Sequence, residues 1–152
     1  MYSAYYIFHI AGVAVWIGSF AAFGFLLRSL IKNNESLEKY TFVISRIRLW
    51  INGGVIPSAL IVLITGVLMI LQFNRENLPF YLIFMEQAGS LVILFTIIVV
   101  SVYSRKLRTK LQGLPLKKEK TLESVGLMYT NYLFTSAALA LLIIMVVGMR
   151  LT

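Results

Sequence analysis

His9 is the single histidine in a chain of 152 residues that contains no cysteine. It lies a few residues inside a long apolar segment, in the spaced run His9, Gly12, Trp16 and Gly18. An imidazole at that depth in hydrocarbon is costly, so such a group is a default candidate for a functional site. The chemistry that a neutral imidazole offers there is metal ligation, and we predict that His9 is a metal ligand. The alternative is a hydrogen bond from His9 to a neighbouring helix.

Other side chains with donor atoms fall near the level of His9 when depth is counted at about 1.5 Å per residue. They are Met69 late in the second apolar segment, Met85, Glu86 and Gln87 early in the third, and Met145 and Met149 late in the fourth. A carboxylate at this depth needs a partner or a proton. We therefore predict Glu86 and Gln87 as catalytic residues, whereas single methionines are more often packing residues than ligands.

The face of the first segment that carries His9 also carries Gly12 and Trp16, because residues at helical spacing share one face. Gly12 removes side-chain bulk beside His9, which would let a flat ligand approach, and a planar porphyrin fits this combination. Close helix packing is the alternative use of Gly12. We expect haem b, bound by this face together with weak sixth ligands and propionate partners drawn from Met69, Met85, Met149, Arg75 and Arg150.

The elements that must position these residues are membrane helices. The chain is 59% hydrophobic and 13% charged, far from the composition of a soluble domain. Four apolar stretches, at about residues 5–30, 51–73, 80–103 and 125–151, are each long enough to span a bilayer. The sequence thus predicts one all-α domain over residues 1–152, an integral membrane four-helix bundle of up-down-up-down topology. Residues 36–50 can extend the second helix, and Pro57 predicts a kink near Gly53 and Gly54.

The charge distribution predicts the orientation of this bundle. The net charge is +8, and nearly all basic residues lie between the first and second or between the third and fourth apolar stretches. Only Arg75 and Arg150 fall on the other side. By the positive-inside rule both termini are extracytoplasmic, in a multi-pass protein of a bacterial-type cytoplasmic (inner) membrane. The expected partner of the basic loops is anionic lipid of the bilayer rather than nucleic acid, and small residues on the first helix allow a homodimer.

The chain resembles, over nearly its whole length, the four-helix superfamily of the copper-resistance D membrane domain and the HemJ-type protoporphyrinogen oxidase. The resemblance lies in short motifs, namely His9-x2-Gly12-x3-Trp16-x-Gly18, Arg46-x-Arg48, Thr65-Gly66 and Arg105. In the HemJ-type branch the histidine of the first helix is taken to ligate haem b, which implies the same role for His9. That branch carries a functional lysine in its third helix, where this chain has Met85-Glu86-Gln87. The copper branch usually has further His or Met ligands.

One histidine restricts the redox chemistry. A di-haem electron carrier needs paired axial histidines, which a monomer of this chain cannot supply. A single haem leaves the sixth iron position open or weakly ligated, as binding of O2 or NO requires. We therefore expect a haem-dependent oxidoreductase acting on a small gas (NO or O2) or on a quinol or porphyrinogen reductant. The alternatives are a copper-binding or copper-translocating protein that uses His9 and the outer methionines, and a non-enzymatic membrane partner in which His9 and Glu86 only pair.

Overall fold

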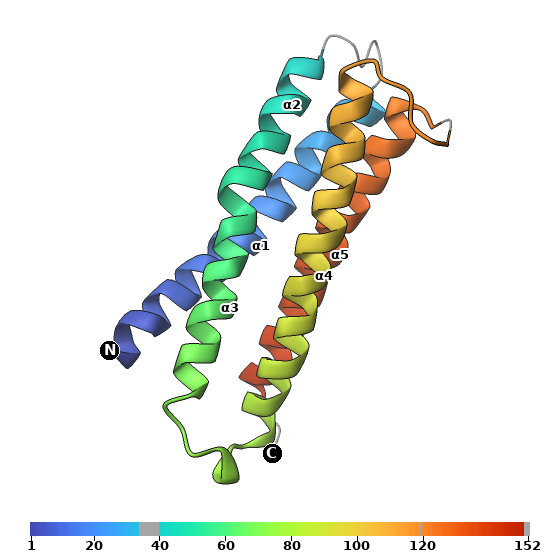
Figure 1. Ribbon diagram of the computed structural model, residues 1–152. Coiled ribbons are helices and arrows are strands. Elements are labelled where there is room, and N and C mark those ends of the chain that lie inside the picture. Colours follow the sequence, from blue (N-terminus) through green and yellow to red (C-terminus); the bar gives the residue numbers. More distant parts are fainter. Residues whose placement is uncertain (34–39, 119, 151–152) are drawn as a thin grey trace.

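The computed structural model describes residues 1–33, 40–118 and 120–150, and within these ranges every regular element is helical (Figure 1). The elements are α1 (Tyr2–Lys32), α2 (Thr41–Trp50), the π-helix η2 (Ile51–Val55), α3 (Ile56–Ile70), the 3-10 turn η3 (Arg75–Asn77), α4 (Phe80–Leu111) and α5 (Leu122–Gly148). The segments α2, η2 and α3 run on as one helix, Thr41–Ile70. The described residues thus form four helices that are each long and apolar enough to cross a membrane.

Helix ends differ from the limits of the apolar stretches because local capping sets them. The helix α4 continues past residue 103 to Leu111, where Gly113 adopts a φ of 72°. The N–H of Gly113 donates to the carbonyl of Lys110, and the N–H of Leu114 donates to that of Thr109, the Schellman pattern that closes a helix. At the start of α5 the hydroxyl of Thr121 accepts from the N–H of Ser124, an N-cap.

In contrast to α4, the second and fourth membrane helices end earlier than expected. The second helix ends at Ile70 of α3, a little before the expected limit at about residue 73. The helix α5 ends at Gly148 rather than near residue 151, and Leu151 lies outside the described residues. The expected extension before residue 51 is present as α2 from Thr41. Its first part, residues 36–39, lies outside the described residues as well.

The irregularity expected around Pro57 takes the form of the π-helix η2. A proline has no N–H, and its ring clashes with the carbonyl four residues earlier, here that of Gly53. The chain widens just before the proline, and the N–H of Ile56 donates to the carbonyl of Ile51, five residues back. Such π-turns are frequent at functional sites. This one carries Asn52, whose side chain reaches α4.

The helices form a ring in which each contacts its two neighbours. The helix α1 packs against α3 and α5, and α4 packs against the same two helices. In Figure 1 both chain ends lie toward the lower end, and α1 runs obliquely, so that its N-terminal part departs from α5. Contacts between α1 and α5 are found in the other half, where Gly24 faces the ring of Phe134 and Ile31 faces Gly126.

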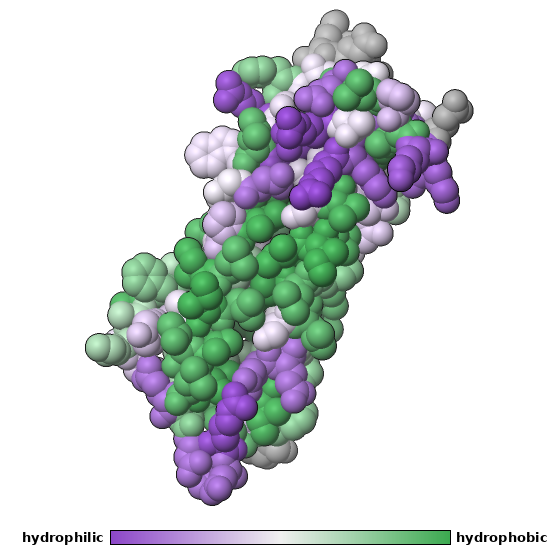
Figure 2. All heavy atoms as spheres, viewed as in Figure 1, coloured by the Kyte–Doolittle hydropathy of each residue, from purple (hydrophilic) through white to green (hydrophobic). Residues whose placement is uncertain are grey.

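The core is apolar, and so is much of the surface. Trp16, Phe20, Ile51, Tyr129 and Leu133 belong to one buried core cluster. On the face that Figure 2 shows, a broad hydrophobic band crosses the middle, between two hydrophilic ends. Such a surface is costly in water and suits helices that have satisfied their backbone hydrogen bonds internally and face lipid.

Candidate functional site

The imidazole of His9 is held by α3 through one ring nitrogen. Its Nδ1 lies 3.0 Å from the carbonyl oxygen of Val62 and 3.2 Å from Oγ1 of Thr65. A carbonyl can only accept a hydrogen bond, so Nδ1 carries the hydrogen and donates it. In the neutral ring this tautomer leaves the lone pair on Nε2. Histidines that ligate metals are held in this way, with the second nitrogen donating to a carbonyl or carboxylate.

Thr65 and Gly66 of α3 make the contact with His9 possible. The hydroxyl of Thr65 donates to the carbonyl of Ile61 at 2.6 Å, so its oxygen can accept from His9. At Gly66 a Cβ atom would lie 3.2 Å from Cε1 of His9. The imidazole therefore lies directly on the backbone of α3, and the glycine is needed for that approach.

A cavity of about 410 Å³ lies beside His9, between α1, α3, α4 and α5. This volume falls in the usual range for small-molecule and cofactor pockets, about 300 to 1,000 Å³. The walls are mainly apolar, as such pockets usually are. The lining includes five residues that the sequence analysis selected, namely His9, Trp16, Met69, Met85 and Glu86.

Trp16 contributes an unsatisfied donor to the cavity wall. It is 4% exposed, lines the cavity, and its Nε1 has no hydrogen-bond partner among the described residues. It lies seven residues after His9, about 10 Å deeper along α1. A buried N–H without an acceptor is unfavourable. Trp16 is thus a residue of the cavity wall whose own buried N–H lacks an acceptor among the described residues.

The structure places Gly12 in a helix contact. A Cβ atom there would lie 2.8 Å from Cγ2 of Val62 and 3.1 Å from the carbonyl oxygen of Ser58. The room that Gly12 leaves is thus filled by α3 and not by the cavity. Close approach to His9 depends instead on Gly66, which the sequence analysis named only as part of a motif.

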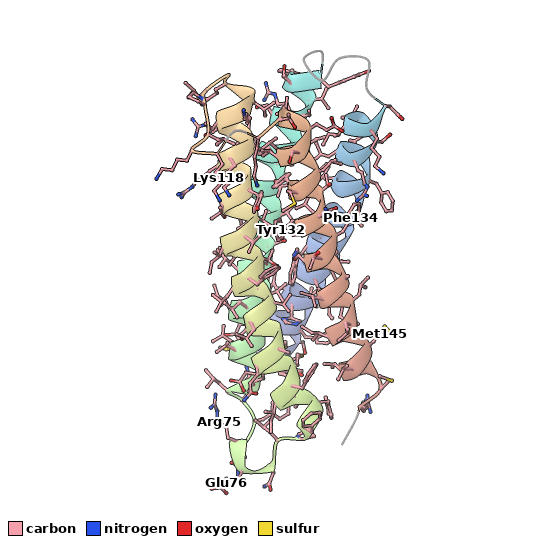
Figure 3. All side chains as sticks on the ribbon, turned by 90° about the vertical axis from the view of Figure 1, so that its right-hand side faces the viewer. Arg75, Glu76, Lys118, Tyr132, Phe134 and Met145 are labelled. Atoms are coloured by element: carbon pink, nitrogen blue, oxygen red, sulfur yellow. The ribbon has the colours of Figure 1, made fainter. Side chains whose placement is uncertain are left out.

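Four further candidates lie at the edge of the cavity or outside it. Gln87 and Arg150 are exposed, Met149 is 60% exposed, and none of the three lines the cavity. Arg75, near the lower end in Figure 3, reaches the cavity edge because its Nη2 lies 3.1 Å from Oε1 of Glu86. Figure 3 also shows Met145 pointing away from the bundle. The methionines that remain as possible ligands are Met69 and Met85.

The pairing of His9 with Glu86, which the alternative of a non-enzymatic partner requires, is not found among the described residues. Glu86 forms an ion pair with Arg75, and His9 bonds to Val62 and Thr65. The reason is positional, since His9 lies against α3, whereas Glu86 lies on α4 and meets the turn that joins these helices.

The donor set limits how a metal could be bound. In the described part of the chain no three His, Asp or Glu side chains come together as a ligand group. A metal beside His9 would therefore need a macrocycle or thioethers for its remaining ligands.

Comparison of the chain with protein-family models, with curated proteins and with solved structures gives no match. The functional argument accordingly rests on this geometry.

Proposed function

We propose that this protein is a membrane-integrated haem b protein in which His9 is the single axial ligand. It acts as an oxidoreductase on a small gas, NO or O2, or on a quinol or porphyrinogen reductant. We place it in a bacterial-type cytoplasmic membrane as an up-down-up-down bundle with both termini extracytoplasmic, since the basic residues gather at the opposite end. The observation that carries the proposal is the hydrogen bond from Nδ1 of His9 to Val62, which leaves Nε2 free beside a cavity.

The residues present fit a haem. His9 offers a neutral nitrogen in a fixed tautomer, and the largely apolar walls suit a porphyrin ring. Met69 and Met85, both in the lining, are thioethers that could serve as a weak sixth ligand. Arg75 is 65% exposed at the cavity edge and could exchange its contact with Glu86 for a propionate.

The protein's own groups would orient the axial imidazole, exclude water from the cavity and accept protons. A haem bound here would supply an iron coordination position for a diatomic gas and a one-electron couple. The carbonyl of Val62 and the hydroxyl of Thr65 fix the plane of the imidazole. The carboxylate of Glu86, half-buried at the edge, is placed to accept a proton from the hydroxyl of a reductant such as a quinol.

The test is the absorption spectrum of purified protein from haem-replete cells. His9→Ala removes the proposed ligand, so we expect the Soret band to be lost. Met149→Leu, which changes an exposed methionine outside the cavity lining, is the matched control and should keep the haem content of the wild type. An unchanged Soret band in a correctly assembled His9→Ala variant would refute the assignment of the ligand.

The second candidate function is copper binding or translocation. The observation that favours it is that Met69 and Met85 line the same cavity as His9, because imidazole and thioether together suit Cu(I). A colourless preparation with stoichiometric copper, lost in both His9→Ala and Met69→Leu, would support copper over haem. A red preparation with a Soret band would exclude copper as the main cofactor.

A further inference from the structure

A second group of polar side chains converges in the half of the bundle away from His9. Arg48 of α2 donates through Nη1 to Oγ of Ser104 on α4 at 3.4 Å, and Asn52 of η2 donates to the same oxygen at 2.8 Å. Tyr129 of α5 lies against Arg48 and Ser104. Asn52 is ten residues before Val62, about 15 Å along the helix. This polar cluster (Arg48, Asn52, Ser104 and Tyr129) is therefore separate from the cavity at His9.

The polar cluster is buried, and its hydrogen bonding is incomplete. Arg48 is 8% exposed, and Ser104 and Tyr129 are fully buried. Three atoms have no partner in the described ranges, namely Nε of Arg48, Oδ1 of Asn52 and the hydroxyl of Tyr129. Each buried polar atom without a partner is unfavourable, and a charged one most of all. These unsatisfied atoms around one serine form a site that a polar ligand would complete.

Donors outnumber acceptors in the polar cluster whichever way the amide is turned. As placed, Ser104 accepts from both Arg48 and Asn52. Rotating the amide of Asn52 by a half turn would let its oxygen accept from Ser104, but would leave its NH2 group without an acceptor. The Nε–H of Arg48, which has no partner as placed, gains none from this rotation in the described contacts, since the amide of Asn52 meets Ser104. A ligand that completes the cluster must therefore bring acceptors.

The charge of the polar cluster is also uncompensated. Among the described residues the one ion pair is that of Arg75 and Glu86, so Arg48 has no carboxylate partner there. Arg108 is close enough to act on Arg48 and adds positive charge. Water could supply acceptors but not a negative charge. An anion supplies both.

We propose that the polar cluster binds a phosphate-class anion, either the phosphate of an acidic lipid or inorganic phosphate. The fork formed by the Nε–H and Nη–H groups of a guanidinium matches two oxygens of such an anion. The hydroxyl of Tyr129 is placed to donate to a third. The site lies about 10 Å from the basic ends of α4 and α5, near the level expected for lipid headgroups.

The experiment uses the full chain in nanodiscs and follows thermal unfolding by tryptophan fluorescence. One series uses neutral phosphatidylcholine with increasing inorganic phosphate at constant ionic strength, and the other adds phosphatidic acid without free phosphate. Arg48→Gln removes the proposed ligand-binding charge. The matched control is Arg46→Gln, because Arg46 is exposed, two residues away, and stacks on the ring of Phe42 at 5.0 Å.

The expected result is a rise in the unfolding temperature of the wild type and of Arg46→Gln, lost in Arg48→Gln. A rise with inorganic phosphate assigns the free anion, and a rise with phosphatidic acid alone assigns the lipid. Equal responses of the two arginine variants, or no response in either series, would overturn the proposal.

Tyr129→Phe tests the site even if Arg48→Gln fails to assemble. Without anion this variant should unfold at a higher temperature than the wild type, because it removes a buried hydroxyl that has no partner. With anion the order should reverse, and the apparent affinity should fall about tenfold. A Tyr129→Phe protein that stays more stable than the wild type at every anion concentration contradicts binding at this hydroxyl.

Discussion

Nδ1 of His9 on α1 lies 3.0 Å from the carbonyl oxygen of Val62 on α3, so the orientation of the imidazole is fixed by the backbone of a neighbouring helix. Backbone atoms in a packed helix move little compared with side chains. The direction of Nε2 therefore follows the packing of α1 on α3. Changes in that packing should alter what the ring can bind, even where they leave His9 itself intact.

Replacing Gly66 by alanine should displace the imidazole. The new Cβ atom would lie 3.2 Å from Cε1 of His9, and crowding of this kind costs about 1 to 3 kcal/mol. We expect haem affinity to fall at least about fivefold, measured as haem per protein from the Soret band during titration. The control is Gly18→Ala, whose Cβ would meet nothing within 4 Å. Equal haem affinity in both variants would show that the approach of His9 to α3 does not govern binding.

Thr65→Val should weaken haem binding less than Gly66→Ala does. Valine keeps the shape of threonine but removes the hydroxyl that faces Nδ1 of His9 at 3.2 Å. The bond to Val62 remains, so the loss should be about 1 kcal/mol. Thr65→Ser retains the hydroxyl and should restore the affinity in the same titration. Complete loss of haem in Thr65→Val would mean that Val62 alone does not hold the ring.

Two glycines at helix contacts should respond differently to alanine. At Gly12 the added Cβ meets the backbone carbonyl of Ser58 at 3.1 Å as well as the side chain of Val62, so α1 and α3 must separate. At Gly126 it meets the end of the flexible Ile31 side chain, which can rotate away. We expect Gly12→Ala to destabilise the fold by about 1 to 3 kcal/mol and Gly126→Ala to be nearly neutral, compared by thermal unfolding. The reverse order would contradict this account of the packing.

Orientation can be tested directly because the chain has no native cysteine. Asn77→Cys places a thiol on the exposed turn between α3 and α4, and Gln112→Cys places one at the exposed end of α4. With both termini extracytoplasmic, a membrane-impermeant maleimide should label position 77 in intact cells and position 112 only after lysis. Labelling at position 112 in intact cells would contradict the proposed topology.

Part of the candidate site could be selected from the sequence because charge and polarity are rare in apolar segments. His9 and Glu86 stand out on that ground alone, and the structure places both at one cavity with Trp16, Met69 and Met85. Gly12, Gln87 and Met149 share the same depth but do not line the cavity. Helical spacing gives the depth of a residue and its neighbours on one face. It does not give the rotation of that face toward the other helices.

The sequence by itself determined that the chain forms long apolar helices, because in hydrocarbon each segment must satisfy its backbone hydrogen bonds internally. Only the tertiary structure decided which side chains meet. By sequence Arg48 is one of many basic loop residues. In the fold its side chain is buried inside the bundle beside Ser104. The tertiary structure also left a cavity where the oblique α1 departs from α5. Both depend on how the helices cross, which arises from contacts between segments distant in sequence.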